Sequence, residues 1–204
     1  MKTIVLTGLI GSGKSAVAAL LRERGVPVYD SDARTKQLYA RRKSLVRRME
    51  EALGVPIRTA EGRLDKKLLA AAIFSDAMAR EKVEALVYPA LLQDFSRWRE
   101  RQAGAPFVVL ESAVILSKPL FEGIWDAVVL VTAPRELRLE RVMARDGASK
   151  EAVLARMAAQ DIPQDRAQVL LPNEGTPEEL SAAVERVFFE KNGYICKLLK
   201  SEKR

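Results

Sequence analysis

The chain has 204 residues, a formal net charge of +7 and no histidine. Proton transfer must therefore use carboxylates, lysine, tyrosine or water, and histidine-ligated metal sites are excluded. Cys196 is the only cysteine, which excludes an intrachain disulfide and fits a reducing compartment. No run approaches the roughly 18 apolar residues that span a bilayer, and the apolar part of the N-terminus is too short for a signal peptide. We therefore expect a soluble cytoplasmic protein.

Short apolar segments alternate with amphipathic ones, which predicts an α/β fold with a mostly parallel sheet and helices on both faces. Five strands are expected, at residues 2–7, 26–29, 107–111, 127–132 and 169–171. Apolar spacing and capping signals predict helices at residues 15–24, 33–53, 65–74, 76–87, 89–102, 133–145 (capped by Thr132), 150–160 (capped by Ser149) and 177–190 (with a capping box at Thr176).

A complete phosphate-loop motif connects the first expected strand to the first expected helix. Gly8-Leu9-Ile10-Gly11-Ser12-Gly13-Lys14-Ser15 matches G-x-x-x-x-G-K-[ST]. The glycines let the loop turn its N–H groups onto phosphate oxygens, and the helix start adds a partial positive charge. Lys14 would lie between the β- and γ-phosphates, and the Ser15 hydroxyl is placed to ligate Mg²⁺. We expect Gly8 to Ala16 to bind Mg-ATP; the alternative is a glycine-rich turn with an exposed lysine.

The rest of the chain selects among phosphate-loop proteins. It has neither the Asn-Lys-x-Asp motif of GTPases nor the Leu-Ser-Gly-Gly-Gln signature of transporter ATPases. Its length, its all-helical stretch and a later arginine-rich helix suit a small-molecule kinase with an arginine-bearing lid. We predict a nucleotide-binding core at residues 1–32 and 105–190, with a lid at about 135–160 inside it. A helical acceptor subdomain at 33–104 and a basic tail at 191–204 complete the expected organisation.

Two aspartates follow the second expected strand, in Asp30-Ser31-Asp32. Ligands of parallel sheets bind beyond the carboxyl ends of the strands. The two carboxylates are therefore candidates to meet Mg²⁺ and an acceptor hydroxyl. Asp32 is also placed to cap the helix expected to begin at Ala33, and the two roles can coexist.

Arginines recur along the helix expected after residue 132. Arg138, Arg141 and Arg145 have spacings of three and four residues, so they share one face. Such a face suits a lid that neutralises phosphate. The alternative is a solvated face on which Glu136 and Glu140 are the surface partners.

Taken together, these features resemble bacterial dephospho-coenzyme A kinases. The resemblance rests on the phosphate loop, the Asp pair, Gly62-Arg63-Leu64, Ala72-Ile73-Phe74, Val87-Tyr88-Pro89 and the stretch from Arg141 to Gln160, and it spans residues 1 to about 190. In that family ATP phosphorylates the ribose 3′-hydroxyl of dephospho-coenzyme A, the last step of coenzyme A synthesis. The resemblance implies a P-loop kinase fold with a helical acceptor domain and a lid. It also implies ATP and Mg²⁺ as cofactors and dephospho-coenzyme A as substrate.

The resemblance also implies roles for individual residues. Asp32 orients or deprotonates the 3′-hydroxyl, while Arg141 and Arg145 neutralise the transferring phosphate. Lys66 falls near the acceptor, where the family usually has an arginine. Asn173 and Gly175 belong to Asn173-Glu174-Gly175, which is similar to the family's loop near the adenine.

The chain departs from the family at two expected substrate-binding positions. Tyr88-Pro89 stands where the family usually has His-Pro, and tyrosine keeps a hydrogen-bonding OH without the imidazole charge. Glu111 begins Glu111-Ser112-Ala113-Val114-Ile115, where the family usually has Asp-x-Pro-Leu-Leu, and its carboxylate could reach Mg²⁺ through water. The segment between Gln160 and Asn173 is also short relative to the family.

Two other readings stay open at this point. The chain could be a kinase for another nucleoside or nucleotide, or a non-catalytic nucleotide-binding regulator. A nucleic-acid-binding module has only the positive charge to support it, because no reader motif accompanies that charge. We expect no nucleic-acid or membrane partner, and a monomer or weak homo-oligomer.

Overall fold

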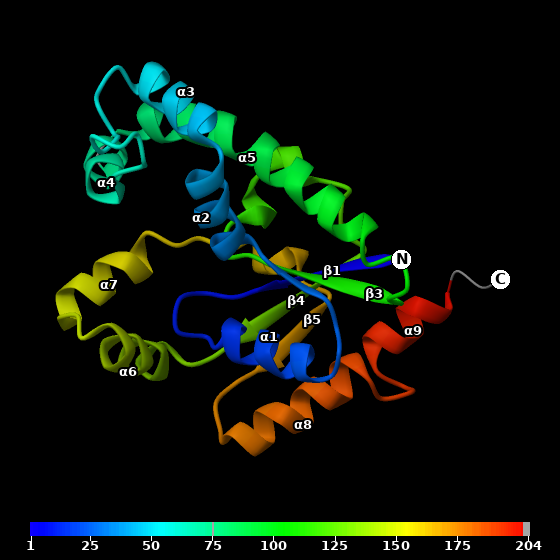
Figure 1. The fold of residues 1–204 in the computed structure, drawn as a ribbon. Coiled ribbons are helices and arrows are strands. Elements are labelled where there is room, and N and C mark those ends of the chain that lie inside the picture. Colours follow the sequence, from blue (N-terminus) through cyan, green and yellow to red (C-terminus); the bar gives the residue numbers. More distant parts are fainter. Residues whose placement is uncertain (75, 202–204) are drawn as a thin grey trace. The chain divides into compact units, whose positions relative to one another are not determined.

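The computed structural model describes residues 1–74 and 76–201. The chain divides into two compact units (Figure 1). The first combines Met1–Tyr29 with Gln102–Arg204, and the second is Asp30–Arg101. Among the described residues, none of the helices has the combination of length and apolar character needed to cross a membrane.

The first unit is built on a five-stranded sheet with the strand order β2-β3-β1-β4-β5. The strands are β1 (Lys2–Thr7), β2 (Val28–Asp30), β3 (Phe107–Glu111), β4 (Ala127–Thr132) and β5 (Val169–Pro172). The central strand β1 pairs in parallel with β3, where Leu6 lies opposite Glu111, and with β4, where Thr7 lies opposite Leu130. The α/β fold and its five parallel strands are confirmed. The carboxyl ends of β1, β3 and β4 consequently meet at one edge of the sheet.

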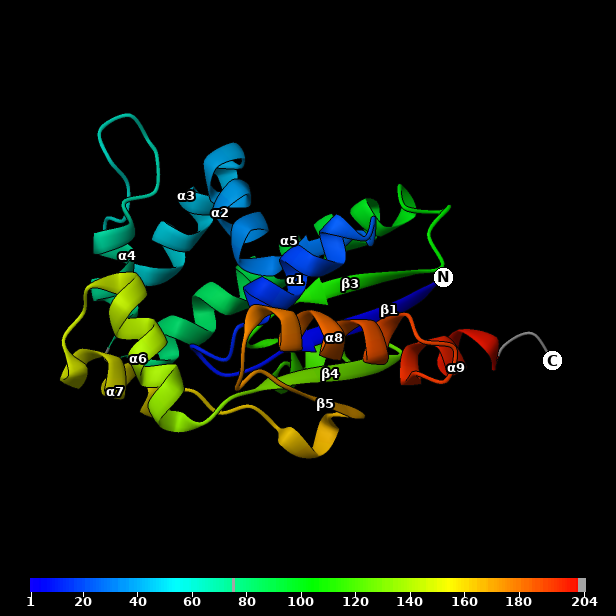
Figure 2. The same ribbon diagram turned by 90° about the horizontal axis from the view of Figure 1, so that it is seen from below.

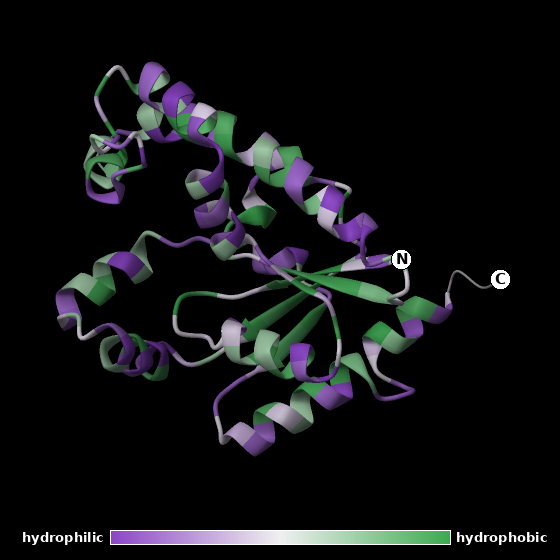
Figure 3. Cartoon of the chain, in the orientation of Figure 1, coloured by the Kyte–Doolittle hydropathy of each residue, from purple (hydrophilic) through white to green (hydrophobic). Residues whose placement is uncertain are grey.

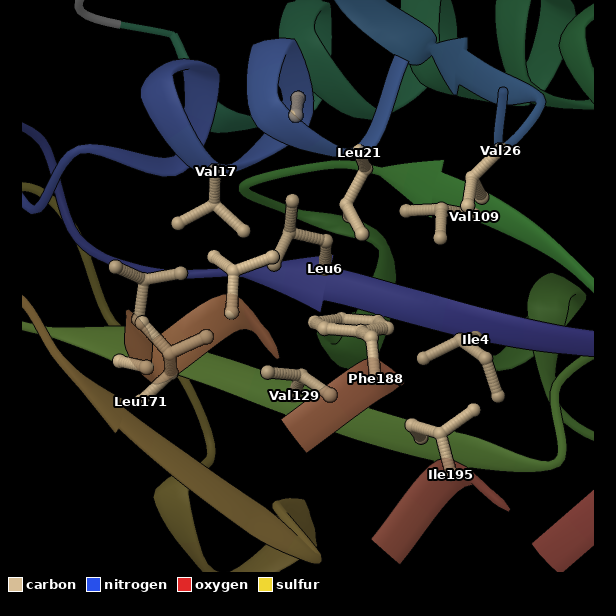
Figure 4. Close-up of a cluster of buried hydrophobic side chains, with 14 of the residues drawn as sticks. Ile4, Leu6, Val17, Leu21, Val26, Val109, Val129, Leu171, Phe188 and Ile195 are labelled. Atoms are coloured by element: carbon tan, nitrogen blue, oxygen red, sulfur yellow. The ribbon is translucent and has the colours of Figure 1, made fainter. Parts of the chain in front are cut away.

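Three helices cover one face of this sheet: α1 (Lys14–Glu23), α8 (Pro177–Phe188) and α9 (Tyr194–Lys200). Figures 1 and 2 show α1 and α8 side by side against the strands. In the close-up of the core, Leu21, Phe188 and Ile195 reach from these helices toward Ile4 and Leu6 of β1 (Figure 4). Burying each such side chain contributes about 1.5–3 kcal/mol. This packing fixes the start of α1 at the carboxyl end of β1.

The strands of the sheet and the more peripheral helices of the first unit differ in hydropathy (Figure 3). The strands β1, β3 and β4 are hydrophobic along most of their length and buried, whereas helix α6 (Arg135–Asp146) is mostly hydrophilic. Helix α6 forms a hairpin with α7 (Lys150–Ala158), and the two enclose a small apolar cluster of their own. Three short 3₁₀ turns complete the unit, η1 (Ile115–Ser117), η2 (Pro119–Phe121) and η3 (Gln164–Arg166).

Two of the three expected caps in the first unit are present. Ser149 accepts from the N–H of Ala152, and Thr176 forms a capping box with Glu179. The prediction that Thr132 caps the arginine-rich helix is wrong, because α6 begins after Pro134. Thr132 instead continues β4, where its carbonyl accepts from the N–H of Asn173 at 2.8 Å.

In its described residues, 30–74 and 76–101, the second unit is built from helices: α2 (Ser31–Arg41), α3 (Lys43–Leu53), α4 (Lys66–Phe74) and α5 (Ala77–Glu100). The single helix expected at residues 33–53 is therefore two helices. The break lies at Arg42, whose φ of −108° and ψ of 77° are not helical. The bend lets both α2 and α3 pack on α5 and buries the apolar face of α3 (Leu45, Val46 and Met49).

Conversely, the two helices expected at residues 76–87 and 89–102 are one continuous helix, α5, with Pro89 inside it. A proline in a helix interior costs about 3 kcal/mol because it removes a hydrogen bond and crowds the preceding turn. The buried side chains of α5 nevertheless continue at four-residue intervals on both sides of Pro89, at Ala79, Val83, Val87, Leu91 and Phe95. Their combined burial outweighs the cost of the proline.

Asp30, the last residue of β2, and Asp32 have separate structural roles. Asp30 is the N-cap of α2, and its Oδ1 accepts from the N–H of Ala33 at 2.8 Å. Asp32 lies inside the first turn and is exposed. The prediction that Asp32 caps this helix is wrong, because the helix begins at Ser31 rather than Ala33.

Replacing the capping side chain tests this assignment. Asp30→Ala is expected to lower the free energy of unfolding by about 1 kcal/mol, since one N–H of the first turn loses its acceptor. Asp30→Asn keeps an acceptor oxygen and should cost less. Urea unfolding followed by circular dichroism measures both, with Asp32→Ala as the control from the same turn. Equal destabilisation by Asp30→Ala and Asp32→Ala would contradict the assignment.

Candidate active site

The loop between β1 and α1 brings backbone close to its neighbours at two glycines. Gly11 has a φ of +81°, and a Cβ there would lie 2.5 Å from the Arg138 carbonyl oxygen. Gly13 has a φ of +94°, and a Cβ there would overlap the Asn173 amide. Lys14 is the first residue of α1, where the helix start favours anions. The loop therefore has the shape and the charge of a phosphate-binding loop. Its glycines also allow the segments that contain Arg138 and Asn173 to pack directly against it.

A hydroxyl and a carboxylate meet beside this loop. The Ser15 Oγ donates to Glu111 Oε1 at 3.1 Å, and Glu111 is buried at the end of β3. The Arg22 guanidinium lies 3.8 Å from the other carboxylate oxygen. Mg²⁺ prefers oxygen ligands and usually keeps several waters with one or two protein carboxylates. The donor set of Ser15 and Glu111 fits this ion, and the longer glutamate side chain reaches the serine directly.

Asn173, directly after β5, connects the phosphate loop to the lid. Its Nδ2 donates to the Ser12 carbonyl at 2.8 Å, and the residue is only 6% exposed. Arg141 of α6 donates to the Asn173 carbonyl at 3.0 Å and to its Oδ1 at 3.4 Å. Two residues that were predicted to contact ATP from different segments are thus joined to each other and to the loop backbone.

The local structure explains why a glycine stands at position 175. A Cβ at this position would overlap the Glu179 carboxylate, which accepts from the N–H of Thr176 in the capping box. The glycine therefore lets the chain turn from Asn173 into α8. Its predicted contact with ATP stays a prediction.

Arg145 takes part in an ion-pair cluster that closes the lid hairpin. Its Nε donates to Asp146 Oδ1 at 2.7 Å, and Arg156 of α7 donates to Asp146 Oδ2 at 2.6 Å. These two arginines hold the pKa of the Asp146 carboxyl well below its usual range. The side chain of Arg145 is 60% exposed. The predicted phosphate contact of Arg145 would therefore require it to exchange the Asp146 carboxylate for a phosphate.

The remaining predicted residues belong to the second unit. Asp32 is in the first turn of α2, and Lys66 is the exposed first residue of α4. Tyr88 of α5 is half-buried and donates to Glu84 Oε1 at 3.2 Å. Burial, followed by the negative charge of Glu84, raises the pKa of Tyr88 above its ordinary value. Smaller contributions come from Tyr39 and Asp32, so Tyr88 remains a protonated hydrogen-bond donor at neutral pH.

Sequence reasoning gave no role to two polar residues of the lid. Asp146 pairs with two arginines. Gln160, just after α7, accepts the N–H of Ile10 at 2.6 Å. A polar side chain at the end of a helix carries no pattern that predicts such a long-range contact. The paired arginines around Asp146 were the one local signal that could have been used.

Comparisons with known proteins find the same family of proteins along most of the chain. The family model described as Dephospho-CoA kinase matches residues 2–179. The dephospho-CoA kinase of Thermus thermophilus is 40% identical over 93% of this chain and 92% of its own length. That of Anaeromyxobacter dehalogenans is 36% identical over 95% of this chain and 93% of its own length.

Solved structures give the same result for the fold. The crystal structure of TT1252 from Thermus thermophilus is 39% identical, covers 94% of this chain and 98% of that chain, and superposes with a TM-score of 0.79. Dephospho-CoA kinase from Campylobacter jejuni shares the fold at 20% identity, with a TM-score of 0.60 over 92% of this chain and 95% of that chain.

Removing the Asn173 side chain should destabilise the first unit. Asn173→Ala leaves the Ser12 carbonyl without its donor and Arg141 without one acceptor, so we expect a loss of about 1–3 kcal/mol in the free energy of unfolding. Thermal and urea unfolding measure this loss. The exposed Asn192 offers a matched control, because Asn192→Ala should change stability by less than about 0.5 kcal/mol. Similar values for the two variants would show that the contacts of Asn173 add nothing to stability.

Proposed function

Because this chain belongs to the dephospho-CoA kinase family, we propose that it transfers the γ-phosphoryl group of ATP to the ribose 3′-hydroxyl of dephospho-coenzyme A. The products are coenzyme A and ADP. The observation that carries the proposal is the complete phosphate loop, in which the Ser15 hydroxyl is hydrogen-bonded to Glu111. This loop lies within the part of the chain, residues 2–179, that the family model matches. A cytoplasmic location is part of the same proposal.

The loop supplies the binding site for the ATP phosphates. Its backbone N–H groups and the start of α1 would hold the phosphate oxygens, and Lys14 would add a full positive charge between the β- and γ-phosphates. Ser15 and Glu111 would hold Mg²⁺, which when bound supplies positive charge to the phosphate oxygens. Glu111 is itself held by Arg22, so its carboxylate is oriented before any ligand arrives.

The acceptor side of the reaction requires a group that receives a proton. As the bond from the 3′-oxygen to the γ-phosphorus forms and the bond from that phosphorus to the β,γ-bridging oxygen breaks, the hydroxyl proton passes to Asp32. Transfer of this kind has a loose transition state, so positioning matters more than base strength. Asp30 is used as a helix cap, which leaves Asp32 as the carboxylate of the pair for this role. The single O–H of Tyr88 donates to Glu84, so its hydroxyl oxygen would be available to accept a hydrogen bond from the acceptor.

The lid arginines would complete the charge balance. Arg141 is held by Asn173, which also contacts Ser12 of the phosphate loop, so its charge would lie near the phosphates. Arg145 is the more exposed residue, and its partner Asp146 is a single carboxylate on the surface. A triphosphate carries several times the negative charge of that carboxylate, so it would compete successfully for Arg145.

An acceptor-dependent ADP-release assay tests the function. With ATP and Mg²⁺, dephospho-coenzyme A is expected to stimulate ADP production, with coenzyme A as the second product. Lys14→Ala should abolish the stimulation because the phosphates lose their main positive charge, and it also controls for contaminating kinases. A folded, ATP-binding protein that dephospho-coenzyme A does not stimulate would refute the substrate assignment. Stimulation by a different nucleoside would identify the acceptor instead.

The two aspartates provide a matched pair for the catalytic step. Asp32→Asn is expected to lower kcat by about 100-fold or more, because the amide cannot accept the proton. Asp30→Asn keeps a capping oxygen and should retain most of the wild-type kcat. Steady-state kinetics and circular dichroism of both variants decide the matter. Near-normal kcat in Asp32→Asn would remove that residue from the chemistry.

A further inference from the structure

The lid contacts one residue of the phosphate loop, Ile10, in three ways. Its N–H donates to Gln160 Oε1 at 2.6 Å, just beyond the end of α7. Its carbonyl accepts from Arg138 Nη1, near the start of α6, at 3.5 Å. Its side chain packs against the apolar cluster inside the lid hairpin, Val142, Val153 and Met157. Both ends of the lid therefore hold the same loop residue.

Packing is incomplete beside one part of the loop, next to Leu9 and Ser12. A pocket of about 220 Å³ is lined by Leu9 and Ser12 of the loop together with Arg138, Ile162 and Gln164, among others. Among the residues that the structure describes, the Ser12 hydroxyl is buried without a hydrogen-bond partner. A backbone segment beside a cavity gains few dispersion contacts there. The hydrogen bonds of the Ile10 peptide therefore add to the packing that positions this part of the loop.

The contact with Gln160 is the stronger of the two polar contacts to Ile10. The distance of 2.6 Å is short for an N–H to oxygen bond, whereas the 3.5 Å contact with Arg138 is long. The Ile10 N–H is donated to Gln160, so the phosphates are left to the N–H groups that follow it. A fixed Ile10 peptide sets the direction in which Gly11 and the later residues continue.

We propose that Gln160 is a positioning residue for nucleotide binding. It holds the Ile10 peptide so that the following amides of the loop face the phosphates, and it connects the end of the lid to the loop. The inference rests on the proposed function only in requiring that the loop binds a nucleotide. It assigns Gln160 an effect on nucleotide affinity and none on affinity for the acceptor.

A pair of glutamine variants tests this role. Gln160→Met keeps the length of the side chain but removes the acceptor oxygen. The control is Gln168→Met, because Gln168 Oε1 likewise accepts a backbone N–H, that of Val128 at 2.8 Å, but at β4 rather than at the loop. Isothermal calorimetry with Mg-ADP, without acceptor, should show roughly tenfold weaker binding for Gln160→Met, the size expected for one net hydrogen bond. Gln168→Met should bind as the wild type does.

Two further measurements separate positioning from general destabilisation. Gln160→Met should raise the KM for ATP and leave the KM for the acceptor unchanged. Hydrogen exchange at the Ile10 amide, measured without any nucleotide, should become faster in Gln160→Met but stay slow in Gln160→Glu, which keeps an acceptor oxygen. If Gln160→Met is too unstable to purify, the shorter Gln160→Asn serves the same comparisons.

The outcomes distinguish this inference from the proposed function. Mg-ADP binding by Gln160→Met within twofold of the wild type, or equal weakening in Gln168→Met, would overturn the role of Gln160. If the binding and exchange pattern holds while dephospho-coenzyme A fails to stimulate the wild type, the substrate assignment alone is wrong. Unchanged exchange at Ile10 in Gln160→Met would refute the hydrogen bond itself.

Discussion

The close approach of two segments to the backbone of the phosphate loop is the constraint on which the active site depends. Arg138 lies against Gly11 and Asn173 lies against Gly13, at distances that leave no room for a Cβ. The glycines therefore do more than free the loop to bind phosphate. They also admit the groups that satisfy the loop's own backbone, such as the Asn173 amide at the Ser12 carbonyl. The loop, the lid and the segment after β5 are thus parts of one hydrogen-bonded structure.

The fold and the conformation of the phosphate loop could be predicted from local patterns, because their signals are local. The phosphate loop is a contiguous motif, and the capping box at Thr176 spans only four residues. The errors occurred where tertiary packing decides. The helix expected at residues 33–53 is interrupted at Arg42, and the break expected at Pro89 is absent. In both cases the burial of apolar side chains between helices outweighs the local preference of the sequence. The hydrogen bond from the Ile10 N–H to Gln160 joins residues 150 positions apart, and no periodic pattern in the sequence predicts it.

The departures from the family's usual residues are understandable in physical terms. A glutamate at position 111 extends one methylene further than an aspartate, and in this chain that reach ends at the Ser15 hydroxyl. Arg22 takes the second carboxylate oxygen, which offsets part of the cost of burying the charge. Tyr88 keeps a donor where the family usually has histidine, and burial keeps that donor protonated. Each departure changes the group but retains an oxygen ligand or a hydrogen-bond donor.

The ion pairs of the α6–α7 hairpin are compatible with the proposal that it is a lid whose arginines contact phosphate. Asp146 pairs with Arg145 of α6 and Arg156 of α7, so the hairpin is closed by charge as well as by its apolar cluster. All three side chains are partly exposed, and exposed ion pairs contribute only about 0–1 kcal/mol. The proposed movement of Arg145 from Asp146 to a phosphate would therefore cost little, while Arg156 would keep the carboxylate paired. The hydrogen bonds of Ile10 to Gln160 and of Asn173 to Ser12 would remain in place during that exchange, which would confine the proposed movement to the tip of the hairpin.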